Sequence, residues 1–292
     1  MKEAVLTFIN DLIEYPFLQQ AFSTSVILGI TCGIIGCFII LKGLALMSDA
    51  ISHAVLPGVA ISYLLKISYF YGAIVFGILA ALGISFVKQK SKIKIDSAIG
   101  IVFSAFLALG ILLVTKIQSP INLNNILFGN VLTINSSDRI LTEAVAAAVL
   151  LGIFLFYKEL QLITFDPVMA KASGFPVKLI NYLLMIMLTL ITVVSLQTVG
   201  VILVVSLLIT PAATAFLLTK KLSNMLWISA LIGAFSAIIG LFFSVTYNLP
   251  SGVVIVLTAT FIFLIVFFLS PKNGILWNTA KKSKAKRFYQ SK

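Results

Sequence analysis

The chain alternates between long apolar runs and short polar gaps. A helix that crosses a bilayer needs about 20 predominantly apolar residues. The pattern predicts nine such helices, at residues 20–41, 44–65, 71–87, 97–115, 139–157, 177–196, 198–218, 225–246 and 253–270. The expected fold is therefore all-α, with a single polytopic membrane domain over residues 1–292.

Several residues modify this pattern of runs. Residues 177–218 are almost continuously apolar and too long for one span, so a tight turn is expected near Gln197–Gly200. Pro57 and Pro211 lie inside apolar runs, where proline kinks or interrupts a helix. In membranes such broken helices often line a cavity. Gly29 and Gly33 are four residues apart, a spacing that lets helices pack closely in lipid.

Composition supports the bilayer as the solvent of this chain. Hydrophobic residues make up 60% and charged residues 10%, and the mean hydropathy is +1.14. Soluble domains are about 45–50% apolar and about 25% charged. The net charge of +12 would suit nucleic acid, but nearly all the charges lie between the apolar runs or in the C-terminal tail. A nucleic-acid partner is therefore not expected.

Three segments are expected outside the spans. Residues 1–17 are predicted to form an amphipathic segment at the membrane surface. Residues 116–138 are predicted to form an outer loop, in which 121–128 form a short helix that dips back to the surface. The tail 279–292 is basic, and its expected role is to hold the topology and to contact anionic lipid.

The distribution of Lys and Arg predicts the orientation, because cytoplasmic loops carry the excess of these residues. An N-terminus outside the cell places only Lys2, Lys66, Lys116 and Arg139 on the outer side. It places most of the others on the cytoplasmic side: Lys42, Lys88, Lys90, Lys92, Lys94, Lys158, Lys171, Lys178, Lys220, Lys221 and the basic tail. An odd number of spans then leaves the C-terminus in the cytoplasm.

One carboxylate interrupts an apolar run. Asp49 lies in the run 44–65, and His53, the only histidine of the chain, follows four residues later. Residues i and i+4 share one face of a helix, and ionisable groups within a bilayer usually serve a pathway or a site. The pair, with Ser52 beside it, predicts a metal or proton site that needs further ligands from other helices, water or a second subunit. The alternative is an interfacial Asp49 for which His53 is merely the hydrogen-bond partner.

Several catalytic motifs are missing from the sequence. No GxxxxGK[ST] loop is present to bind ATP, and a chain with one histidine cannot hold an HExxH zinc site. The chain is therefore not expected to be an enzyme, and energy for pumping must come from another subunit or from an ion gradient.

The segment 165–176, FDPVMAKASGFP, predicts a short capped helix on the cytoplasmic side. Asp166 suits the N-cap and Pro167 the first helical position. Gly174 is suited to end the helix. This helix is either a connector or a docking element for a soluble partner.

Five segments together resemble the metal-specific ABC permease family, which serves manganese, zinc and iron uptake. They are LMSDAISHAVLPGVAISYLL at 46–65, ILFGNVLTINSSD at 126–138, DPVMAKASGFPV at 166–177, VGVILVVSLLITPAATAFLLT at 199–219 and LPSGVVIVL at 249–257. They follow the order of the family and cover nearly the whole chain.

The resemblance implies a fold similar to that of the vitamin B12-type importers and a location in the bacterial cell membrane. It implies a pathway formed by two copies of the chain, two cytoplasmic ATPase subunits and an extracytoplasmic metal-binding protein. Asp49 and His53 would lie in the translocation path, and Asp166, Ala170 and Gly174 in the loop that docks on the ATPase. No permanently bound cofactor is expected.

The wording ILFGNVL resembles manganese permeases more than zinc permeases. Manganese prefers oxygen ligands, which Asn122, Asn124, Asn125 and Asn248 could supply, although loop asparagines more often form turns. Alternatives are a Zn²⁺ or Fe²⁺ permease, a proton-coupled secondary transporter, an intramembrane enzyme or metal-sensing receptor, and a permease for bulky iron–siderophore or cobalamin cargo.

Overall fold

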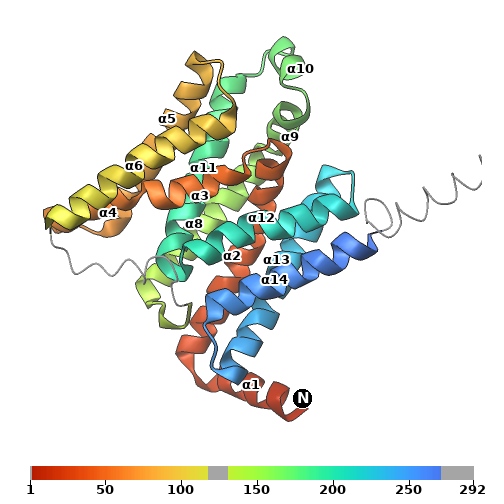
Figure 1. The fold of residues 1–292 in the computed structure, drawn as a ribbon. Helices are drawn as coiled ribbons and strands as arrows, with labels where there is room; N and C mark the ends of the chain where they lie inside the picture. Colours follow the sequence, from red (N-terminus) through yellow and green to blue (C-terminus); the bar gives the residue numbers. More distant parts are fainter. Residues whose placement is uncertain (1, 118–130, 271–292) are drawn as a thin grey trace, which may run out of the picture.

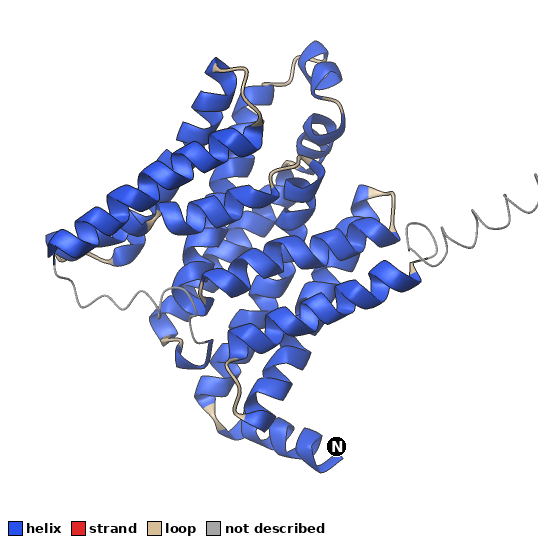
Figure 2. Cartoon of the chain, in the orientation of Figure 1, coloured by secondary structure: helices blue, strands red, loops and turns tan. Residues whose placement is uncertain are grey.

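A computed structural model describes residues 2–117 and 131–270. The regular elements in these ranges are helices joined by short turns (Figure 2). They are α1 (Lys2–Glu14), α2 (Pro16–Leu41), α3 (Ala45–Ala54), α4 (Leu56–Leu65), α5 (Tyr69–Lys90), α6 (Ile95–Ile117), the 3-10 turn η1 (Val131–Thr133), α8 (Ser136–Leu155), α9 (Tyr157–Phe165), α10 (Pro167–Ala172), α11 (Val177–Val199), α12 (Val201–Leu218), α13 (Leu222–Tyr247) and α14 (Ser251–Leu269). The short helix expected at 121–128 and the basic tail lie outside the described residues.

Each predicted span has its helix. Eight segments are long and apolar enough to cross a membrane, with α3 and α4 together making one of them. The bent pair α8 and α9 supplies a ninth, at the position of the predicted span 139–157. The bend of 70° between α8 and α9 is a feature that the hydropathy pattern did not predict.

The predicted turn between the sixth and seventh apolar runs is present at Gly200. Helix α11 ends at Val199 and α12 begins at Val201, while Gly200 adopts φ 84° and ψ 163°. This backbone conformation is strained for a residue with a Cβ atom. One glycine therefore joins two long apolar helices without an intervening loop.

Helix α2 forms the centre of the molecule and packs along α13, α12 and α8 (Figure 1). The α2–α13 contact is very close, because a Cβ atom on Gly29 would lie 2.5 Å from the carbonyl oxygen of Gly233. Ser229 donates a hydrogen bond of 2.7 Å to the carbonyl of Gly33 across the same contact. Small residues here replace side-chain packing with backbone packing.

The two ends of the bundle differ. Helix α10 and the α5–α6 turn lie at one end, whereas α1 and the α13–α14 turn lie at the other (Figure 1). Helix α1 fixes itself to α13 through Phe8, whose ring meets that of Phe242 edge-on at 5.4 Å. Its opposite side leaves Leu6, Ile9 and Ile13 exposed. The amphipathic prediction for residues 1–17 thus corresponds to a helix with a docked side and an uncovered apolar side.

Candidate metal site

Asp49 and His53 lie one turn apart on α3, as their spacing predicted. His53 Nε2 is 3.7 Å from Asp49 Oδ1, which is longer than a hydrogen bond. The side chain of Asp49 is 47% exposed and that of His53 is 23% exposed. Both therefore present unshared lone pairs to the same open face of α3.

Neighbouring side chains hold the histidine and bury the serines. The ring of His53 meets that of Phe103 on α6 edge-on, with the centroids 5.6 Å apart. Ser52 is buried and donates its hydroxyl to the carbonyl of Ser48 at 2.9 Å. Ser52 therefore lies on the packed side of the helix rather than beside the open face, and its predicted role in the path stays a prediction.

The helix breaks directly after the histidine. Helix α3 ends at Ala54, Val55 joins the two pieces, and Pro57 stands in the first turn of α4. Proline has no N–H, so it cannot donate to the carbonyl four residues earlier, that of His53. Pro57 thus interrupts the span, as expected, whereas Pro211 lies within the unbroken α12.

Glycines of α5 and α6 enclose this break. A Cβ atom on Gly110 would lie 2.7 Å from Leu56 Cβ and 3.0 Å from Pro57 Cδ. Gly72 of α5 meets Gly58 of α4 backbone to backbone. Sequence reasoning did not single out these residues, because a glycine in an apolar run does not reveal which distant helix it contacts.

The described part of one chain does not close a metal site. Within residues 2–117 and 131–270, no three His, Cys, Asp or Glu side chains lie close enough to share an ion. Asn122, Asn124 and Asn125 lie outside these ranges. Asn248 ends α13 with φ 52°, in the left-handed conformation that suits an asparagine in a turn.

The segment after α9 forms the predicted capped helix. Asp166 Oδ1 accepts a hydrogen bond of 2.8 Å from the Met169 amide, and Gly174 ends the turn at φ 83°. Ala170 is fully buried, while the neighbouring Val168 and Met169 are 79% and 56% exposed. The helix is therefore anchored by one small residue and presents apolar side chains outward.

A hydrogen bond links the end of α2 to α9, the helix that precedes α10. Lys42 Nζ donates to the carbonyl of Ile163 at 3.3 Å. Burial, and secondarily the charge of Lys88, lowers the pKa of Lys42 to about 8. Only Gly43 and Leu44 separate Lys42 from α3, and Ile163 lies near the end of α9, directly before α10. The hydrogen bond therefore connects the segment that precedes the Asp49–His53 helix to the segment that precedes the capped helix.

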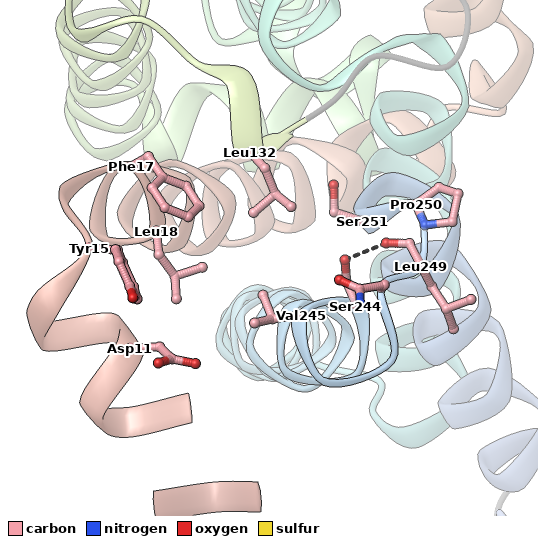
Figure 3. A pocket seen from close by; sticks show the side chains of 11 residues that line it. Asp11, Tyr15, Phe17, Leu18, Leu132, Ser244, Val245, Leu249, Pro250 and Ser251 are labelled. Atoms are coloured by element: carbon pink, nitrogen blue, oxygen red, sulfur yellow. Dashed lines mark hydrogen bonds between the residues drawn. The ribbon is translucent and has the colours of Figure 1, made fainter. Parts of the chain in front are cut away.

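A cavity of about 530 Å³ lies at the opposite end, between the α1–α2 connection and the α13–α14 turn (Figure 3). Its walls are mostly apolar, and Ser244 is hydrogen-bonded there to the carbonyl of Leu249 at 2.7 Å. Asp11 is the only carboxylate on its lining.

The fold and the site define a multi-helix membrane protein with a candidate metal-binding pair in one of its spans. The model of the ABC 3 transport family matches residues 14–270, so the chain belongs to this family. The manganese transport system membrane protein MntC of Listeria monocytogenes is 57% identical over 277 residues, which cover 95% of this chain and 99% of that protein. The manganese import system permease protein ScaB of Streptococcus gordonii is 49% identical, covering 94% and 99%.

Solved structures agree with this fold. A chain of PsaBC from Streptococcus pneumoniae in complex with Fab is 50% identical and superposes with a TM-score of 0.83, covering 92% of this chain and 97% of that one. An inward-facing metal-chelate type ABC transporter superposes with a TM-score of 0.69 at 18% identity, which shows the fold alone.

Proposed function

We propose that this chain is the membrane-spanning permease subunit of an ATP-driven importer for Mn²⁺. The observation that carries the proposal is the Asp49–His53 pair on an open face within an apolar span. A carboxylate oxygen and an imidazole nitrogen suit divalent first-row metals such as Mn²⁺. The names of two relatives with 57% and 49% identity over nearly the full chain support manganese as the cargo.

A second copy of the chain completes the path in this proposal. A charged group that faces lipid costs several kcal/mol, at least about 2.5 at the bilayer centre. Asp49 is nearly half exposed on one copy, so another protein surface must cover it. A two-fold axis beside α3 would bring two carboxylates and two imidazoles together, and thus double the ligands that one chain supplies.

The charges support an N-terminus outside the cell. Lys88, Lys90, Lys92 and Lys94 lie at the α5–α6 turn, at the same end as α10. Under the positive-inside rule this end faces the cytoplasm. The α1 end then faces outward, where an extracytoplasmic metal-binding protein would deliver the ion.

The capped helix α10 of each copy would dock on one of two cytoplasmic ATPase subunits. Exposed Val168 and Met169 offer apolar contacts for such a partner. Movement of α10 would reach α3 through α9 and the Lys42–Ile163 hydrogen bond. The break at Val55 would let α3 tilt relative to α4.

The resulting mechanism uses the chain's own groups in sequence. The released ion enters between the two copies, where the charge of Asp49 lowers the cost of leaving water and His53 contributes nitrogen. ATP-driven closure of the ATPases shifts α10 and the helices around Pro57 and Pro211. The path then opens toward the cytoplasm, and water replaces the protein ligands.

Asp49→Asn tests the proposed function, because it keeps the shape of the side chain and removes its charge. The complex with its ATPase is reconstituted in liposomes, and radioactive Mn²⁺ uptake is measured with Zn²⁺ as competitor. Uptake should be lost while assembly is kept. Asp138→Asn, in the first turn of α8, is the matched control and should transport normally. Normal accumulation by Asp49→Asn would refute the proposal.

Gly174→Pro tests the coupling loop separately. Proline cannot adopt the positive φ of Gly174, so the end of α10 must rearrange. We expect ATP hydrolysis to continue while metal transport stops, measured on the same reconstituted complex. Unchanged coupling would leave this segment a connector.

A further inference from the structure

Two hydroxyls on α12 behave differently from most serines and threonines of the bundle. Thr189, Thr214 and Ser236 each donate to the carbonyl four residues earlier, at 2.7–2.9 Å. Ser206 Oγ and Thr210 Oγ1 instead face each other at 3.5 Å, the outer limit of a hydrogen bond. Among the described residues neither hydroxyl makes another hydrogen bond, so lone pairs remain free for a ligand.

The pair lies on the uncovered side of α12. Ile202 and Phe216 are 42% and 46% exposed, and Ser206 and Thr210 are half-buried between them along the same stripe. The opposite side of the helix, with Leu207 and Leu208, is fully buried. The chain therefore places two hydroxyl groups on a face that would otherwise be apolar.

Helix α12, which carries this face, is a neighbour of α3, which carries the Asp49–His53 pair. Helix α12 packs beside α3, and both lie at the front of the molecule in Figure 1. Leu41 at the end of α2 and Thr219 at the end of α12 line one pocket, and Val205 near the start of α12 packs against a cluster that contains Val55, so α12 runs antiparallel to α3. Asp49 and His53 lie between Leu41 and Val55 in the sequence, and Ser206 and Thr210 lie between Val205 and Thr219. The two hydroxyls therefore belong to the stretch of α12 that runs beside α3.

We infer that Ser206 and Thr210 supply additional oxygen ligands to the ion at the Asp49–His53 site. This inference rests on the proposed function and deepens it. Hydroxyls are hard donors without charge, so they suit Mn²⁺, which accepts more oxygen ligands than Zn²⁺. Zn²⁺ favours four ligands in a tetrahedron, with nitrogen and sulfur preferred. The two hydroxyls therefore bias the site toward manganese.

The test is the double variant Ser206→Ala/Thr210→Val, in the reconstituted complex with its ATPase. The first change removes one atom and the second is isosteric, and the two single variants are measured beside the double one. The readouts are the KM for radioactive Mn²⁺ and the Zn²⁺ concentration that halves uptake. Thr214→Val/Ser236→Ala is the matched control, because its hydroxyls are bonded to their own helices. Thr210→Ser restores a hydroxyl.

Loss of the two oxygen ligands should raise the KM for Mn²⁺ at least about tenfold, because removing even an outer-shell partner of a metal site costs roughly 10–100-fold in affinity. The Zn²⁺ needed for half-inhibition relative to that KM should fall by a similar factor, while the control and Thr210→Ser stay near wild type. Unchanged values in the double variant, with uptake abolished by Asp49→Asn, would overturn this inference and leave the proposed function intact. Normal uptake by Asp49→Asn would overturn both.

Discussion

The α2–α13 contact and the proposed transport face, formed by α3 and α12 with Asp49, His53, Ser206 and Thr210, use polar residues in opposite ways. Between α2 and α13, Gly29 and Gly233 bring the backbones together, and Ser229 donates to the carbonyl of Gly33. On α3 and α12, Asp49 and His53 do not reach hydrogen-bond distance, and Ser206 and Thr210 barely touch.

Under the proposed function, this difference separates polar groups that hold helices together from polar groups that are available to the ion. A polar group that is satisfied inside the bundle strengthens helix packing. A polar group left partly exposed and unsatisfied costs free energy unless a ligand or a second subunit uses it. The two regions thus differ in the hydrogen bonding and the exposure of their polar groups, and four substitutions probe this comparison.

The largest effect is expected for Gly29→Val in the α2–α13 contact. The new Cβ would lie 2.5 Å from the Gly233 carbonyl oxygen, and backbone cannot yield as a side chain can. Overpacking costs about 1–3 kcal/mol, and this site should lie at the upper end. Fluorescence-detected size exclusion should show little assembled protein. A monodisperse peak with the wild-type melting temperature would contradict the close packing.

On the transport face, His53→Ala should leave folding unchanged and impair function. Loss of a nitrogen ligand should reduce Mn²⁺ transport roughly tenfold, in the range found when groups around metals are removed. Uptake assays and thermal melts of the same preparation measure the two effects. If the variant only loses expression while its specific transport is retained, the histidine serves packing against Phe103.

Ser229→Ala should produce a smaller, purely structural loss. It removes the 2.7 Å hydrogen bond to the Gly33 carbonyl, worth about 0.5–1.5 kcal/mol. The melting temperature should fall slightly while the KM for Mn²⁺ stays constant. A changed KM would show that Ser229 also affects transport and would contradict the separation of the two regions.

The smallest effect is expected for Gly100→Ala on the exposed side of α6, the counterpart of Gly29→Val. No heavy atom lies within 4 Å of the new Cβ. Alanine is favoured over glycine in a helix interior by about 1 kcal/mol, so thermal stability should rise slightly or stay constant. A marked loss of assembled protein would indicate that this face is covered in the complex.

The sequence by itself determined the spans, the turn at Gly200, the capped helix at Asp166 and the shared face of Asp49 and His53. Each depends on the length of an apolar run or on contacts within four residues. Hydropathy and helix geometry control both of these, without reference to distant parts of the chain.

Only the tertiary structure decided which glycines pack backbone to backbone, where α8 bends into α9, and which hydroxyls lie on the partly exposed side of α12. Ser52 lies beside Asp49 in the sequence yet is buried, whereas Thr210 is distant in the sequence and lies on the open face. The physical reason is that hydropathy shows which runs can cross the lipid but does not show which side of each helix is covered by other helices. Whether a polar residue is buried or exposed therefore depends on helices that come from separate parts of the chain and pack against its own.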